Sequence, residues 1–281
     1  MGLTSTLEKP SFPVSFSSGV LGLKREFDQA GRLNDLMNVI PNFQDKVGRS
    51  VGVELNMVDV SWLSELLNLL KGETLRFFQE LADQGGVLSL HTPNGVNYGE
   101  VDSAETAAVI KNIHRVHEVL PITNDVVHVD LAAPERRLVV AEAMGRDSVV
   151  FEATDGRNKG YPARTVQELS KLVEQGLYVL IDLGHVQHAC LVEQFPNMIQ
   201  QLGTGIKEYH VSAVHGPNGM HFPLSSQYGE TVLEMLNSSA PIMDGRVKVF
   251  ESPMPPDMNL LDFMLEEYQL LIDANNNALL A

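Results

Sequence analysis

Cysteine is almost absent: the chain of 281 residues contains only Cys190, so no disulfide can form within it. Disulfides are typical of oxidising compartments, and their exclusion favours a reducing, cytoplasmic setting. Long apolar runs are absent as well, because no segment approaches the ~18 consecutive apolar residues of a membrane span, and the first residues lack the apolar core of a signal peptide. We therefore expect a cytoplasmic protein without a membrane partner.

Basic residues are scarce relative to acidic ones. The chain has 20 Lys and Arg against 36 Asp and Glu, which gives a formal net charge of −16. Nucleic-acid binding depends on Lys and Arg that neutralise phosphates, and the sequence contains no run of basic residues. The charge therefore argues against nucleic acid as a partner, whereas divalent cations and small neutral substrates are compatible with it.

Short β-rich runs alternate with amphipathic helical segments along the whole chain, and no repeat or low-complexity tract interrupts them. Most of the runs are continuously apolar, which is typical of parallel strands buried on both faces. The predicted strands are Val14–Phe16, Val51–Leu55, Val87–His91, Val126–Val129, Ser148–Glu152, Tyr178–Asp182, Ile206–Val211 and Val247–Glu251.

Helical patterns lie between these strands. They are clearest at Trp62–Leu70, Ser103–Val119, Pro134–Met144, Thr165–Gln175, Val186–Leu202, Gly229–Leu236 and Leu260–Ile272. Eight strands that alternate with helices, without a linker rich in Pro, Gly and Ser, predict a (β/α)8 TIM barrel that occupies residues 1–281 as a single α/β domain. An open, doubly wound sheet is the structural alternative.

Polar residues end almost every predicted strand. In the stretch "YVLIDLGHVQHA", the apolar residues of a strand are followed directly by Asp182 and then by His185. In a TIM barrel the carboxyl ends of the strands meet at one face, where active sites form. Seven of the eight predicted strands end in an acid or a histidine, namely Glu54, His91, His128, Glu152, Asp182, His210 and Glu251.

Each of these residues has an ordinary structural explanation when it is taken alone. A terminal acid such as Asp182 most often caps the following helix, and a single histidine most often makes a structural hydrogen bond. Together, however, carboxylates and imidazoles that converge on one axis would repel or stay unsatisfied without a cation. We therefore predict a divalent metal site, and this mixture of ligands suits Zn²⁺, Mn²⁺, Co²⁺ or Fe²⁺ better than Mg²⁺.

The remaining histidines and the cysteine are assigned mostly ordinary positions. His114 and His117 fall within a predicted helix, where surface or packing roles are expected. His188 falls about one turn into another predicted helix, and Cys190 is expected inside that same helix. His215, in the loop after the seventh strand, is equally compatible with substrate contact and with an ordinary loop position.

Four short blocks resemble conserved segments of the xylose-isomerase-like TIM-barrel superfamily: "FEATDGR", "LIDLGHVQHA", "EYHVSAVHG" and "VFESP". This superfamily includes endonuclease IV, sugar isomerases, ketose 3-epimerases and sugar phosphate isomerase/epimerase-like proteins. The resemblance covers roughly residues 87–253, and its motifs are specific as a set although each is weak singly.

The resemblance to the epimerases implies a metal quartet of Glu152, Asp182, His210 and Glu251, with one ligand for each successive βα unit. Glu152 and Glu251 would also be the catalytic base and acid, which transfer protons through a metal-stabilised enediolate of a small polyhydroxylated carbonyl compound. His185 matches the histidine of the family's Asp-x-x-His motif. It would hold a substrate oxygen in an epimerase-like enzyme and a metal in an endonuclease-like one.

The resemblance to endonuclease IV implies further metal ligands. His91 and His128 lie where that enzyme has histidines, and His221 follows in "NGMHFPL". Gly219, however, stands where the endonuclease pattern has an aspartate, so a zinc cluster of that type would lack one ligand. The epimerase pattern also has a gap, because no arginine lies in the loop before His221.

Three functions therefore stay open: a metal-dependent sugar isomerase or epimerase, an endonuclease IV-like phosphodiesterase, and a barrel that binds a metal or ligand without turnover. Candidates for a second metal or for substrate binding are Glu54, His91, His128, His185, His215 and His221. The loop "DGRNKG", with Arg157 and Lys159, is compatible with an anionic substrate and with a solvated turn. The sequence determines neither the sugar-like substrate, nor the metal, nor whether the chain forms a homo-oligomer.

Overall fold

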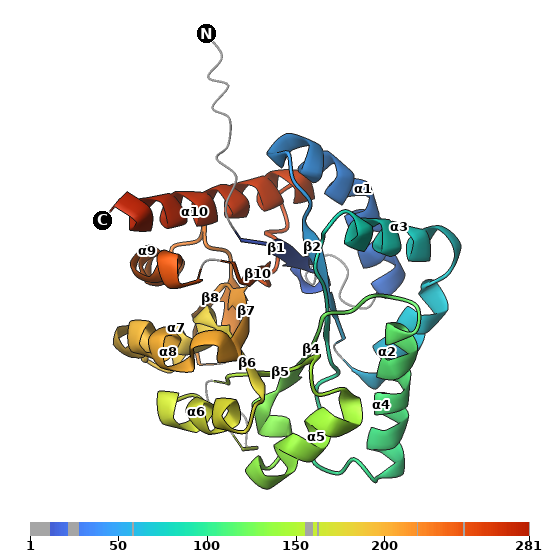
Figure 1. Ribbon diagram of the computed structural model, residues 1–281. Coiled ribbons are helices and arrows are strands. Elements are labelled where there is room, and N and C mark those ends of the chain that lie inside the picture. The colour runs from blue at the N-terminus through green and yellow to red at the C-terminus, as the bar shows by residue number, and fades with distance from the viewer. Residues whose placement is uncertain are drawn as a thin grey trace.

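A computed structural model describes residues 12–21, 28–57, 59–154, 160–161, 163–217, 219–243 and 245–280. Parallel strands close into a barrel at the centre, and helices surround the barrel on the outside (Figure 1). The fold is the (β/α)8 TIM barrel that the alternation of strands and helices predicts. The alternative of an open sheet is wrong, because the first and last strands of the barrel pair with each other.

The strands follow one another around the barrel in chain order, and the pairing of β1 with β10 completes the ring. The barrel strands are β1 (Val14–Ser17), β2 (Gly52–Asn56), β3 (Leu88–His91), β4 (Asn124–His128), β5 (Val149–Glu152), β6 (Tyr178–Asp182), β7 (Ile206–Val211) and β10 (Val247–Phe250). Every predicted strand is confirmed to within two residues at each end, because the apolar runs that mark the strands also fix their limits.

The α-helices are α1 (Gln29–Val47), α2 (Val60–Leu69), α3 (Gly72–Asp83), α4 (Ala104–His117), α5 (Arg137–Met144), α6 (Val166–Glu174), α7 (Leu183–His188), α8 (Phe195–Leu202), α9 (Glu230–Met243) and α10 (Leu260–Leu280). Polar side chains define several helix starts. Asp59 caps α2, Ser103 caps α4, and Thr165 forms a reciprocal capping box with Glu168 at the start of α6.

The prediction of one helix over Val186–Leu202 is wrong. The structure has α7, then a break at Cys190, which has a φ of 57°, and then α8. Pro196 stands in the first turn of α8, where its missing N–H costs nothing, but inside a continuous helix it would remove a hydrogen bond and clash. Cys190 is therefore an exposed turn residue rather than a helical one.

The helices α1 and α3 were not among the segments with the clearest helical pattern. The proline at position 41 lies inside α1, where it interrupts the sequence signal for a helix. Gly72 opens α3 with a φ of 53° and lowers its apparent helical propensity. Both helices are nevertheless amphipathic, and each buries apolar side chains such as Leu36 and Phe78.

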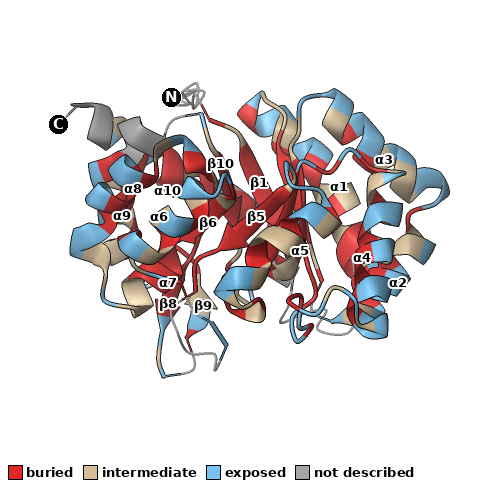
Figure 2. Ribbon diagram, turned by 60° about the horizontal axis from the view of Figure 1, so that its bottom comes forward, coloured by how far each residue is buried: buried red, intermediate tan, exposed pale blue. Residues whose placement is uncertain are grey.

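The main apolar core lies between the barrel and the surrounding helices. The strands of the barrel are almost entirely buried, whereas the helices expose their outer faces (Figure 2). Inside the barrel, Val126, Val150 and Leu180 form a separate small apolar cluster. Residues two apart on a strand share a face, so the positions two residues before and after these three also point into the barrel. Many of those positions are polar.

A hairpin extends the seventh βα connection at the carboxyl end of the barrel. It consists of β8 (Ala213–His215) and β9 (Met220–Phe222), which pair antiparallel. Glu267 of α10 fixes the segment after this hairpin, because its carboxylate accepts hydrogen bonds from the backbone N–H groups of Leu224 at 2.8 Å and Ser225 at 3.0 Å. Within the described part of the chain, no helix combines the length and apolarity needed to cross a bilayer.

His117, in the last turn of α4, forms an ion pair at the opposite end of the barrel strands. Its Nε2 lies 2.9 Å from both carboxylate oxygens of the buried Asp125. The hydrogen bond to Asp125 outweighs burial and raises the pKa of His117 above its ordinary value of 6.5. A raised folded-state pKa contributes stability that is fully present below the unfolded-state pKa and is lost as the pH rises through the folded-state pKa.

We predict that His117→Gln lowers the free energy of unfolding by on the order of 1 kcal/mol below pH 6.5, and by less once the pH exceeds the raised pKa. Urea unfolding of both proteins from about pH 6 to about pH 9 measures this difference. His114→Gln, at an exposed histidine of the same helix, is the control and should show little pH-dependent change. A loss that is constant over the pH range would contradict the prediction.

Candidate functional site

The pairing of the strands around the closed barrel places the polar residues at the strand ends at the same height along the barrel axis. In a parallel sheet, residues that are register partners point to the same face. His128 is the partner of Glu152, and Asp182 is the partner of His210, so all four point into the barrel. His91, which is the register partner of an asparagine at the end of β2, faces the same space.

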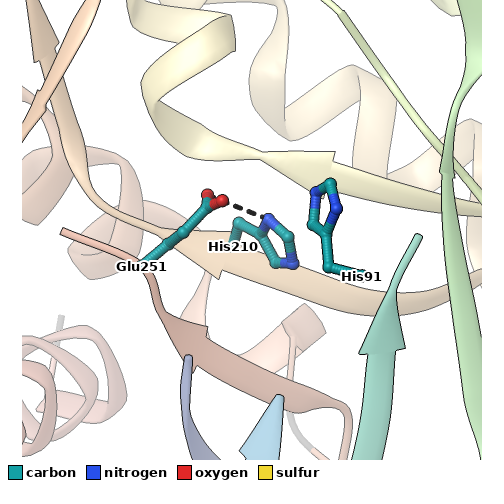
Figure 3. A group of neighbouring side chains, drawn as sticks. All are labelled: His91, His210 and Glu251. Atoms are coloured by element: carbon teal, nitrogen blue, oxygen red, sulfur yellow. Dashed lines mark ion pairs between the residues drawn. The ribbon is translucent and has the colours of Figure 1, made fainter. Parts of the chain in front are cut away.

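His210 is the central residue of the cluster and is fully buried. Its Nε2 lies 2.9 Å from Oε2 of Glu54 and donates a hydrogen bond to it. Its Nδ1 lies 3.1 Å from Oε2 of Glu251 and 3.9 Å from Oε1 of Glu152. Figure 3 shows the imidazole between Glu251 and His91, whose ring lies 5.8 Å from it. The Nε2 edge of His210 thus faces Glu54, and the Nδ1 edge faces Glu152 and Glu251 at the ends of their strands.

Glu152 is the second point of convergence. Its Oε2 lies 3.1 Å from Nε2 of His91 and 3.1 Å from Nε2 of His128. Its Oε1 faces Nδ1 of His185 at 3.5 Å. Glu152 itself is 1% exposed, so these imidazoles are the main compensation for its charge.

Asp182 caps a helix and also faces the cluster. Its Oδ1 accepts a hydrogen bond from the backbone N–H of His185 at 3.0 Å, which caps α7. Its Oδ2 is buried and has no hydrogen-bond partner among the described residues. The aspartate is therefore a helix cap that also presents an unpaired oxygen to the cluster.

His185 and His221 form the outer part of the cluster, with ring centroids 5.7 Å apart. Nδ1 of His185 lies 2.9 Å from the carbonyl oxygen of Ala153 and donates to it, so the lone pair of the neutral ring is on Nε2. Nδ1 of His221 lies 2.8 Å from the hydroxyl of Ser212 and 3.7 Å from Oε2 of Glu251. These contacts fix the orientation of both rings.

Sets of three side chains place one ligand atom each within 4.8 Å of one another. These sets are His91–His210–Glu251, His91–His128–Glu152, Asp182–His185–His221, Glu54–Glu208–His210 and Glu152–Asp182–His210. The structure thus brings three members of the predicted quartet into one set, and the fourth, Glu251, contacts His210 directly.

The buried charges shift pKa values in opposite directions. Burial alone would lower the pKa of His91, but the hydrogen bond to Glu152 and the charge of Glu54 outweigh it and raise the pKa to about 9. The pKa of His210 is also raised against the effect of burial, mainly by Glu54 and Glu251. Burial would raise the pKa of Glu152 and of Glu251, but nearby imidazoles hold both pKa values well below the usual range. Both carboxylates are therefore ionised at neutral pH.

The unpaired atoms of the cluster fit a divalent cation. Oδ2 of Asp182, Nδ1 of His210 and Oε2 of Glu251 are buried, and none of the three makes a hydrogen bond of acceptable geometry to the described residues. A cation that binds here would displace the proton from Nδ1 of His210, and lone pairs of this kind are the donors that Zn²⁺, Mn²⁺ and Co²⁺ accept. Buried polar atoms without partners are uncommon in folded proteins, so their convergence points to a metal rather than to a structural network.

Other predicted residues lie outside the cluster. His215 is exposed on the β8–β9 hairpin, and its ring stacks on that of Tyr228 with centroids 4.0 Å apart, so it is not part of the cluster. Nε2 of His188 contacts the carbonyl oxygen of Gly216 at 3.1 Å, as a structural histidine would. His114 is exposed on α4. Arg157 and Lys159, of the loop after β5, lie outside the described residues.

Glu208 and Asn124 belong to the cluster but were not predicted. Both are buried inside the barrel and are joined by a hydrogen bond from Nδ2 of Asn124 to Oε2 of Glu208 at 2.5 Å. Burial, with Glu54 beside it, raises the pKa of Glu208. Glu208 stands two residues before His210 on β7, so the period of two in a strand was the signal that could have found it.

No family model matches the sequence, and no curated protein matches it significantly. Solved structures do match it over nearly its whole length. A xylose isomerase domain protein from Alicyclobacillus acidocaldarius has a TM-score of 0.63 and 14% identity, and the match covers 95% of this chain and 99% of that one.

Two further matches are to enzymes with different activities. Endonuclease IV from Thermus thermophilus has a TM-score of 0.61 and 18% identity, with 92% of this chain and 98% of that one covered. D-psicose 3-epimerase from Clostridium cellulolyticum has a TM-score of 0.57 and 13% identity, with 95% and 97% covered. The chain therefore shares the TIM-barrel fold of these three proteins.

Proposed function

We propose that the cluster of strand-end side chains binds a divalent metal ion, and that the protein is a metal-dependent isomerase or epimerase of a small carbonyl compound. The observation that carries the proposal is the convergence of the carboxylates of Glu152 and Glu251 on Nδ1 of His210, at 3.9 Å and 3.1 Å, beside the unpaired oxygen of Asp182. Two carboxylates beside a metal site are the groups that proton transfer next to a carbonyl requires.

Each of these residues has its own role in the proposed reaction. A cation held by Glu152, Asp182, His210 and Glu251 would act as a Lewis acid toward the carbonyl and the adjacent hydroxyl oxygen. One of the two glutamates accepts the proton from the carbon next to the carbonyl, and the other supplies a proton to complete the isomerisation. His185, whose Nδ1 donates to Ala153, presents Nε2 to a substrate hydroxyl.

A second candidate function is phosphodiester hydrolysis of the endonuclease IV type. The set His91–His128–Glu152 favours it, because it offers ligands for an additional metal. Two features oppose it: the net charge of −16, which repels a polyanion, and Gly219, which replaces an aspartate of that pattern. A third candidate, a barrel that binds metal without turnover, predicts no dependence of any reaction on Glu152.

Metal content distinguishes these functions most directly. We expect one Mn²⁺- or Co²⁺-like ion per chain, measured by elemental analysis of the purified protein. Two or three zinc ions would support the phosphodiesterase, and none would oppose any metal enzyme. Because a bound ion stabilises only the folded state, removing it with a chelator should lower the free energy of unfolding by about 3 kcal/mol when the ion was present at roughly 100 times its Kd. Re-addition of the ion should restore it.

Glu152→Gln keeps the shape of the side chain and removes its charge. We expect turnover to fall by about 100-fold or more, because a general acid or base contributes rate factors of this size. The measurement is exchange of the substrate's α-proton with solvent deuterium, in a screen of ketoses, with cleavage of abasic-site DNA tested in parallel. Glu142→Gln, at an exposed position of α5, is the matched control. Full turnover in Glu152→Gln would refute its role.

Glu54 accepts a hydrogen bond from Nε2–H of His210. This bond leaves Nδ1 of His210 as the nitrogen that would bind the metal together with the other three ligands. Residues that orient a metal-ligating histidine in this way typically affect metal affinity by about 10- to 100-fold. We therefore expect Glu54→Gln to weaken metal binding by about this factor, as measured by titration calorimetry. An unchanged affinity would show that His210 needs no such support.

A further inference from the structure

A cavity of about 800 Å³ opens directly onto the cluster. Its lining includes Glu251 and His221, which contact each other at 3.7 Å, so a molecule in the cavity touches the cluster from the solvent side. Small-molecule sites typically have a volume of about 300–1,000 Å³ and a few polar groups in an apolar wall. This cavity has both properties.

The wall of the cavity is apolar. Its side chains are Met220 and Phe222 of β9, Pro223, and the prolines Pro253, Pro255 and Pro256 that follow β10. None of these side chains carries an N–H or O–H group. Met220 is 60% exposed and is one of two exposed large hydrophobic side chains among the described residues. An apolar surface next to reactive groups is typical of a binding site.

The wall is held in place by contacts outside the cavity. The pairing of Ala213 with Phe222 fixes β9, and Glu267 binds the backbone just after Pro223. The backbone N–H of Met254 donates to the carbonyl oxygen of Val20 at 2.7 Å, which fixes the segment after β10. The apolar wall is therefore preformed, and a ligand need not order it.

The cavity has few partners for the hydroxyls of a sugar. The hydroxyl of Ser226 donates to the carbonyl oxygen of Pro223 at 2.6 Å and accepts from the N–H of Tyr228 at 3.3 Å. The remaining side-chain partners are Asn56, Ser225 and the two cluster residues at the inner end. A hydroxyl placed against the proline wall would lose its water without replacement, which costs roughly a factor of 10 in affinity.

The cavity also disfavours anions. Its described lining contains no lysine and no arginine, whereas the carboxylate of Glu251 lies at its inner end. A phosphate or carboxylate group at the outer end of the cavity would find no lysine or arginine among the described lining residues to pair with. The described lining therefore favours an occupant whose outer part is uncharged and apolar.

From these observations we infer that the substrate is an uncharged hydroxycarbonyl compound with an alkyl or aryl group. Its oxygen-bearing end faces Glu251 and His221, and its apolar group lies against Met220, Phe222 and the prolines. This inference rests on the proposed function, and it replaces a fully hydroxylated sugar by a substrate whose far end carries no hydroxyls. In the reaction the C–H bond next to the carbonyl breaks and its electron pair forms a C=C bond, while the π pair of the C=O bond moves to the oxygen. The proton passes to one glutamate, and the other glutamate then supplies a proton to carbon, which restores a C=O bond.

Two matched series of compounds test the inference on the metal-loaded full chain. One series is straight-chain α-hydroxyketones of increasing length, and the other is the ketoses erythrulose, xylulose and fructose, which match them in carbon number. Exchange of the α-proton with solvent deuterium gives kcat/KM for each compound. We expect kcat/KM to rise about 3- to 4-fold for each added methylene, and each hydroxyketone of matched length to exceed its ketose. A preference for the ketoses, or no rise with length, would overturn the inference.

Two variants distinguish the contribution of the apolar wall from that of the cluster. Met220→Ser should reduce the gain per methylene without changing metal affinity in calorimetry. Tyr161→Ser, at the other exposed large hydrophobic residue and outside the cavity, should leave that gain unchanged. If the gain in kcat/KM per methylene is the same in Met220→Ser and in the wild type, the apolar wall does not bind the alkyl group of the substrate.

The proposed function and the inference fail in different ways. If exchange of the preferred series persists in Glu152→Gln, the proposed function is wrong whatever the chain-length preference. If neither series exchanges, the proposed function is also wrong for these compounds. Calorimetric binding of both series to the metal-loaded protein then still decides the inference, because tighter binding of longer hydroxyketones supports it and tighter binding of ketoses refutes it.

Discussion

Burial of negative charge is the constraint on which the cluster depends. Glu54, Glu152 and Glu208 are each no more than 1% exposed inside the barrel, and a buried carboxylate is costly unless opposite charge or hydrogen bonds compensate it. His210 compensates several carboxylates at once, because Nε2 faces Glu54 and Glu208 while Nδ1 faces Glu152 and Glu251. A cation at the unpaired atoms would complete this compensation, so the same arrangement that costs folding energy favours metal binding.

The closed barrel sets the relative positions of these side chains. Parallel pairing sets Asp182 level with His210 and His128 level with Glu152, and the alternation of strand side chains directs all four inward. A shift of one residue in any of these strands would turn its polar side chain toward the apolar layer beneath the helices. The register is therefore fixed jointly by the outer core and by the inner cluster.

The candidate site has two chemically different ends. The inner end consists of ionised carboxylates and imidazoles held by hydrogen bonds, such as those of His185 to Ala153 and of His221 to Ser212. The outer end is an apolar wall built on the β8–β9 hairpin and on the segment after β10. Glu251 belongs to both ends, so a substrate group that it contacts lies at the boundary between polar chemistry and apolar recognition.

The sequence alone determined the strands and the polar residues at their ends, because continuous apolar runs mark buried parallel strands and the residues that follow them must lie at one face of the barrel. It could not determine that one helix breaks before Pro196, that Glu208 joins the cluster, or that His215 stays outside it. Those outcomes depend on barrel closure, which sets which side chains from distant strands face each other. The apolar wall is likewise a product of tertiary structure, since β9 and the segment after β10 meet only once the barrel has closed.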